Sequence, residues 1–103
     1  MKRRVRLDAV HAAPALSAMA PEPKRRTKDA LGRLAEDPSG RTNGLDVKQL
    51  DSGDILPHLF RLRVGDWRAV FAVDDREVIV VRAFHRRDGY GWMERRDPVA
   101  AGP

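Results

Sequence analysis

The chain has no cysteine, only 6% aromatic residues and no long apolar run. The absence of cysteine excludes disulfides and thiolate metal sites, and it is compatible with a reducing cytoplasm, where we expect the protein. No stretch approaches the ~20 apolar residues of a membrane-spanning helix, and the basic start MKRRVRLDAV lacks the apolar core of a secretion signal. Three scattered histidines have no metal-ligand spacing, so we expect no metal, no other cofactor and no membrane contact.

What the chain does have is positive charge. Its 103 residues carry a net charge of +5, with a sequence pI of about 10.4. Residues 1–33 hold nine Lys and Arg against three acids, whereas the remaining residues are nearly balanced. Such a surface favours a polyanionic partner, although a solvated basic face has the same composition. The length predicts a single domain, which we place at residues 1–90, followed by a C-terminal tail at residues 91–103.

The hydrophobic pattern predicts an α+β fold. Alternation in residues 3–7 indicates a first strand, and a helix that Pro14 delays or bends follows it. A second helix starts at Pro21 or Pro23 and ends before Pro38, and further strands follow at residues 58–64, 67–73 and 78–85. The segment LDVKQL reads as a short extended piece. The order β-α-α-β-β-β predicts an antiparallel sheet with both helices packed on one face.

The period of two along the last three strands assigns their side chains to faces. The predicted core face holds Phe60, Leu62, Val64, Trp67, Ala69, Phe71, Val73, Val78, Val80 and Phe84. The opposite face holds Arg61, Arg63, Arg68, Val70, Val81, Ala83 and His85. Arg82 falls on the core side by this count, which requires a bulge or an edge position.

The hairpin about Gly65-Asp66 places Arg63 directly opposite Arg68, with Arg61 two residues along the same face. Like charges directly opposite each other destabilise a sheet, and a bound phosphate relieves that repulsion. Guanidinium groups present fixed planar donors suited to phosphate. These arginines therefore indicate an anion site, although ordinary solvent-facing strand residues give the same pattern.

Further candidates lie in the segment FHRRDGY and in the second helix. His85 exchanges protons near neutral pH, Arg86 and Arg87 add charge, and Tyr90 is suited to stacking on a base or to proton transfer. Three cations stand at the start of the second helix, where the helix dipole disfavours them: Lys24, Arg25 and Arg26. This placement indicates either a basic face kept for a polyanion or a poorly optimised helix.

The segments GLDVKQL and HLFRLRVGDWRAVFAVDDREVIVVRAFHRRDGY resemble the C-terminal half of the RelE/ParE superfamily of toxin–antitoxin toxins. With the strand–helix–helix start, the resemblance covers about residues 1–90. The R-x-R-x-G-D-aromatic-R spacing and the late tyrosine resemble the RelE branch more than the ParE branch. The resemblance implies a ribosome-dependent endoribonuclease that cuts mRNA by attack of a ribose 2′-hydroxyl on the adjacent phosphate, without a metal. It also implies a cognate antitoxin and contacts with ribosomal RNA.

The resemblance also implies roles for individual residues. Arg68 and Arg86 match the catalytic arginines of the family, and Tyr90 matches its base-stacking tyrosine. Arg61 and Arg63 stand where well-studied RelE members have lysines. Arginine does not lose its proton, so a general base must lie elsewhere, and the candidates in order are His85, Tyr90 and Asp88. The residues expected to bind RNA phosphates are Arg61, Arg63, Lys48, Arg87, Lys24, Arg25 and Arg26.

Two other functions remain open for the same sequence. One is a ParE-like toxin that inhibits DNA gyrase by binding and cleaves nothing. The other is a catalytically idle member that keeps only a binding surface for RNA or the antitoxin.

Overall fold

Prolines set the start of both helices. In the computed structural model, which describes residues 2–50 and 58–89, helix α1 (Ala13–Ala18) and helix α2 (Pro21–Glu36) each carry a proline at the first or second position. A proline there has the right backbone angle and removes no hydrogen bond that the helix needs. The first helix therefore starts late, as Pro14 predicts. The buried face of α2 comprises Thr27, Ala30, Leu31, Leu34 and Ala35.

Five strands form one mixed sheet in the order β1-β5-β4-β3-β2. The strands are β1 (Arg4–Leu7), β2 (Asp46–Gln49), β3 (Phe60–Val64), β4 (Trp67–Val73) and β5 (Glu77–His85). A 3₁₀ turn, η1 (Arg86–Asp88), follows β5. The α+β class and the element order are confirmed, with LDVKQL supplying β2 as a fifth strand.

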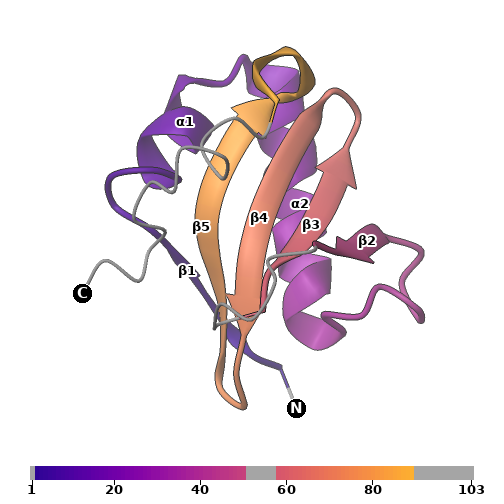
Figure 1. The fold of residues 1–103 in the computed structure, drawn as a ribbon. Coiled ribbons are helices and arrows are strands. Elements are labelled where there is room, and N and C mark those ends of the chain that lie inside the picture. The colour runs from indigo at the N-terminus through magenta and orange to yellow at the C-terminus, as the bar shows by residue number, and fades with distance from the viewer. Residues whose placement is uncertain (1, 51–57, 90–103) are drawn as a thin grey trace.

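The expectation of a wholly antiparallel sheet needs one correction. β1 runs parallel to β5, whereas the other neighbouring pairs are antiparallel. β1 fills the edge beside the last strand, and the chain must leave it at the end where α1 begins (Figure 1). That exit fixes its direction.

Both helices cover the same face of the sheet, and the main core lies between the helices and the sheet (Figure 1). Leu34, Leu62, Phe71 and Val78 are fully buried there. The opposite face carries a second, smaller apolar cluster of buried residues: Leu59, Val70, Ala72 and Val81. Within the described ranges, no helix is long and apolar enough to cross a membrane.

A bulge in β5 explains the position of Arg82. Val70 of β4 pairs with Arg82, but the next residue, Phe71, pairs with Val80, so Val81 is an extra residue in its strand. An inserted residue reverses the facing of everything beyond it. Arg82 therefore shares the face of Val70, away from the helices.

The same bulge corrects three face assignments beyond it. Phe84 was expected in the main core but packs against the second cluster. Ala83 was expected on the outer face but packs against the main core. His85 was also expected on the outer face, yet it pairs with Trp67 on the helix side. Strict alternation of side chains along a strand cannot assign these residues to the correct face, because it assumes that every residue is paired with the neighbouring strand.

The loop between α2 and β2 is organised by the carboxylate of Asp37. Its two oxygens accept hydrogen bonds from the Ser39 and Thr42 hydroxyls, each at 2.6 Å, and from the backbone N–H groups of both residues. These bonds hold the pKa of Asp37 far below its usual range. The loop leads into β2 and so positions that strand at the sheet edge.

Candidate nucleic-acid interface

The face of the sheet opposite the helices carries two cross-strand rows of cations. In the first row, Arg63 of β3 pairs with Arg68 of β4. In the second row, Lys48 of β2 pairs with Arg61 of β3, and Arg61 pairs with Val70 of β4. Val70 in turn pairs with Arg82 of β5, so Arg82 completes the second row. Paired residues on neighbouring strands point to the same face. We call this surface the arginine face, and it comprises Lys48, Arg61, Arg63, Arg68 and Arg82. The predicted opposition of Arg63 and Arg68 is confirmed.

Hydrogen bonds fix some of these guanidinium groups in place. The Nη1 atom of Arg68 donates to the carbonyls of Gly65 and Trp67 at 2.9 and 3.0 Å. Arg61 Nη2 donates to Asp46 Oδ1 at 3.1 Å, and its side chain is only 15% exposed. Arg63, in contrast, is exposed and has no hydrogen-bond or ion-pair partner within residues 2–50 and 58–89. The face therefore combines fixed donors with an uncompensated charge.

The turn at Gly65 and Asp66 brings Arg86 to the same end of the sheet as Arg68. Gly65 has a φ of +59°, the left-handed conformation that a tight hairpin requires. The N–H of Arg86 donates to the Asp66 carbonyl at 2.7 Å, and its Nε lies 3.4 Å from Asp66 Oδ1. The two arginines predicted to be catalytic thus both attach to one turn. Asp66 offsets part of their mutual repulsion.

His85 lies on the other side of the sheet from Arg68. Its ring packs edge-on against Trp67, with ring centroids 5.4 Å apart and planes at 82°. Its Nδ1 accepts a hydrogen bond from the N–H of Arg87, so that nitrogen carries no proton in this arrangement. The structure does not bring His85 together with the arginine face. Arg87 and Asp88 are exposed in η1, and Tyr90 lies outside the described residues.

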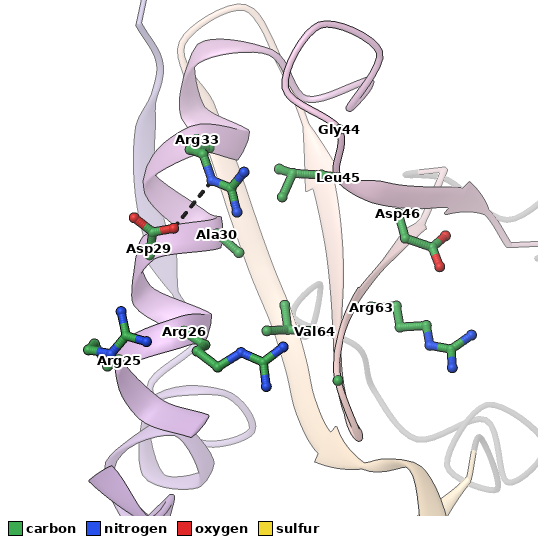
Figure 2. A pocket seen from close by; sticks show the side chains of 11 residues that line it. Arg25, Arg26, Asp29, Ala30, Arg33, Gly44, Leu45, Asp46, Arg63 and Val64 are labelled. Atoms are coloured by element: carbon green, nitrogen blue, oxygen red, sulfur yellow. Dashed lines mark ion pairs between the residues drawn. The ribbon is translucent and has the colours of Figure 1, made fainter. Parts of the chain in front are cut away.

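The cations of α2 lie on the helix side of the sheet, but Arg25 and Arg26 share a groove with Arg63 and Asp46 at the sheet edge. Arg25 and Arg26 line a groove of about 300 Å³ between α2 and the β2–β3 edge (Figure 2). The guanidinium group of Arg26 lies over the hairpin turn. A methyl group added to the Cα of Gly65 would be 3.4 Å from Arg26 Nη1. Arg25 pairs with Glu22 at 2.7 Å, which lowers the pKa of that carboxyl. Lys24 lies in the same first turns of the helix, on the opposite side of the sheet from the arginine face.

The sequence pattern did not assign two residues to this site, Arg82 of the arginine face and Asp46 beside it. The period of two put Arg82 on the core side and required a bulge or an edge position there, and the bulge is confirmed. Asp46 was not singled out, because only the pairing of β2 with β3 places it beside Arg61 and Arg63. No cluster of His, Cys, Asp or Glu suited to a metal occurs among the described residues.

The fold and the site together define a small basic α+β domain with two helices on one face of the sheet and arginines on the other. Residues 7–90 match the ParE toxin family of the parDE type II toxin–antitoxin systems. The chain therefore belongs to this family, within the RelE/ParE superfamily. No curated protein sequence matches the chain significantly.

Three solved structures with the same fold are chains of toxin–antitoxin complexes. A chain of the RelE–RelB complex from Pyrococcus horikoshii superposes with a TM-score of 0.67 at 25% identity, covering 84% of this chain and 97% of that one. A chain of the RelBE2 complex from Mycobacterium tuberculosis gives 0.65 at 24% identity, covering 84% and 100%. A chain of the RelB–RelE complex from Methanococcus jannaschii gives 0.64 at 18% identity, covering 84% and 96%. These likenesses show a shared fold over nearly the whole of each relative.

Proposed function

We propose that this toxin is a RelE-type mRNA interferase, a ribosome-dependent endoribonuclease that stops translation by cutting mRNA. The observation that supports the proposal is the meeting of Arg63, Arg68 and Arg86 at the hairpin turn. Repulsion among these groups weakens the empty site, and a phosphodiester relieves it. Such clustering of like charges is expected where the protein binds a phosphate.

The chemistry assigned to these arginines is electrostatic. When a ribose 2′-hydroxyl attacks the adjacent phosphate, negative charge builds up on the phosphoryl oxygens. Arg68 is already held by two backbone carbonyls, so this donor needs little reorganisation to meet that charge, and Arg86 adds a second, exposed guanidinium paired with Asp66. Arg61 and Arg63 then bind the flanking phosphates, together with Lys48. Arg87, Lys24, Arg25 and Arg26 remain predicted contacts to RNA.

The proton acceptor cannot be one of the arginines, since guanidinium stays protonated at any relevant pH. His85 and Asp88 remain predictions for this role, as does Tyr90. The position of His85 on the helix side argues against its sharing a phosphate with Arg68.

We propose a cognate antitoxin as the protein partner, because the relatives with the same fold were solved as complexes of RelE with RelB. The arginine face is the surface that an acidic segment of such a partner would neutralise. Ribosomal RNA is the second proposed partner.

A second function, inhibition of DNA gyrase by binding, is favoured by one specific observation. The family match over residues 7–90 is to ParE toxins of parDE systems. A binding toxin needs the basic surface but no proton acceptor. A nuclease therefore needs a proton acceptor beside Arg68, whereas a gyrase inhibitor needs only the positive charge of Arg68 and the arginines around it.

The experiment that separates the two functions maps mRNA 5′ ends after expression of the toxin in cells. We expect cuts in phase with codons, reduced at least about 100-fold in Arg68→Ala and in Arg86→Ala, the usual cost of removing one transition-state donor. Arg76→Ala is the matched control, because Arg76 is an exposed arginine in the turn before β5. Intact transcripts with inhibited gyrase supercoiling would contradict the nuclease and support the ParE-like function.

A further inference from the structure

A carboxylate, Asp46, lies at the edge of the arginine face. It is the cross-strand partner of Arg63, which in turn is the partner of Arg68. Neighbouring strands lie ~4.8 Å apart, so the backbones of Asp46 and Arg68 are roughly 10 Å apart. Figure 2 shows the side chains of Asp46 and Arg63 pointing the same way, away from α2. A phosphate bound between Arg63 and Arg68 would lie within reach of this carboxylate.

Arg61 holds the carboxylate by one oxygen only. Its Nη2 donates to Oδ1 at 3.1 Å, and the Arg61 side chain is largely buried, which restrains the pair. The other oxygen, Oδ2, accepts no hydrogen bond from any residue of the described part of the chain. An oriented carboxylate with a free oxygen is the arrangement that proton transfer requires.

We propose that Asp46 is the catalytic base of this toxin, a role that rests on the nuclease function proposed above. Oδ2 takes the proton of the attacking 2′-hydroxyl as the O2′–P bond forms and the P–O5′ bond breaks. The leaving 5′-oxygen takes a proton from water, and the products are a 2′,3′-cyclic phosphate and a 5′-hydroxyl. The Asp46 carboxyl then returns its proton to solvent, so no other reactant is needed.

This assignment accounts for a phosphate site whose strand residues at positions 61 and 63 are both arginines. Arg61 cannot accept the proton itself, but it orients a neighbour that can. Asp46 is on the same face as Arg68, whereas His85 is on the other. The base is therefore supplied by a carboxylate–arginine pair.

The test is single-turnover cleavage of mRNA on purified ribosomes by the full chain, with ribosome affinity measured in parallel. Asp46→Asn keeps an oxygen that accepts from Arg61 but cannot take a proton. We expect its cleavage rate to fall about 100-fold or more, as for loss of a general base, with affinity unchanged or tighter. Asp46→Glu should recover much of the rate. Equal rates for Asp46→Asn and the unmodified toxin would overturn the assignment while leaving the nuclease function intact.

Glu77→Gln is the matched control. Glu77 pairs with Arg6 at 3.2 Å, so it is another acid–arginine pair of the sheet, but at its opposite edge, where β1 lies. We expect this variant to cleave at the normal rate. A loss equal to that of Asp46→Asn would point to a general charge effect and would overturn the proposal.

A double mutant distinguishes the proposed role of Asp46 as proton acceptor from a role in which Asp46 only positions Arg61. If Asp46 only held Arg61, the change Asp46→Asn would cost nothing further in an Arg61→Ala background. We expect it to remain costly there, because the proton acceptor is still removed. If the unmodified toxin cleaves no mRNA at all, the nuclease function and this assignment fail together.

Discussion

The two faces of the sheet use the same strands for different purposes. The helix face buries large apolar side chains under α1 and α2, whereas the arginine face surrounds a small apolar cluster with four arginines and a lysine. On the first face, neighbouring side chains attract each other through burial; on the second, the cations repel one another. The comparison teaches that stability is concentrated on one face, which frees the other to hold an unfavourable arrangement of charge.

The largest expected effect comes from a change on the helix face. Phe71→Ala removes a fully buried ring and should cost about 3–5 kcal/mol, a large part of the stability of a domain this small. Arg68→Ala, on the other face, should cost about 1.5 kcal/mol, because the loss of two hydrogen bonds from a charged group is partly offset by relief of the repulsion with Arg63. Urea unfolding of both variants measures the contrast. Similar losses would contradict the division of roles between the faces.

A matched pair of valines sharpens the comparison. Val80 on the helix face and Val70 on the arginine face are both fully or almost fully buried. Val80→Ala should cost about 2.5 kcal/mol, since two methyl groups are lost and a cavity stays open. Val70→Ala should cost about 1.5 kcal/mol, because long neighbouring side chains on that face can settle into the space. Equal costs in urea unfolding would show that the second cluster is packed as firmly as the first.

The sequence pattern predicts the residues of the helix face better than those of the arginine face. Repeating apolar positions at known spacings located α2, β3, β4 and the first half of β5, because burial enforces them. The residues beyond the bulge were misplaced, since Arg82 on the core side indicated a bulge or an edge position but did not show where an extra residue stands. The opposed Arg63 and Arg68 followed from the turn alone, but Asp46 required the long-range pairing of β2 with β3. Local pattern carries no information about such pairing.

A smaller effect should appear on acidification. The lowered pKa of Asp37 means that its hydrogen bonds stabilise the fold above the unfolded-state pKa, about 3.9, and that this contribution is lost as the pH falls below it. Asp37→Asn should therefore lower the Tm by a few degrees at pH 7 and by less at pH 3. Thermal unfolding of both proteins at the two pH values measures this. A constant difference would contradict the role of the carboxylate in holding the loop before β2.

The smallest effect concerns the salt dependence of RNA binding. Each contact with a phosphate of a single strand contributes about 0.7 to the slope of log affinity against log salt concentration. Arg63→Ala should lower the slope by about that amount, as measured by fluorescence anisotropy with a single-stranded RNA. Lys28→Ala is the control, because it removes an exposed cation of α2. An unchanged slope for Arg63→Ala would remove this residue from the interface.

The bulge at Val81 has a consequence for how the surface can change over time. It divides β5 into two halves whose alternation is out of phase, with the first half tied to the main core. Deleting Val81 would leave Arg82 opposite Val70 and His85 opposite Trp67, so both would stay on their present sides, and only one apolar residue of the second cluster would be lost. The arginine face can therefore lose or gain one apolar residue at this position, while every residue beyond it keeps its partner and its side of the sheet.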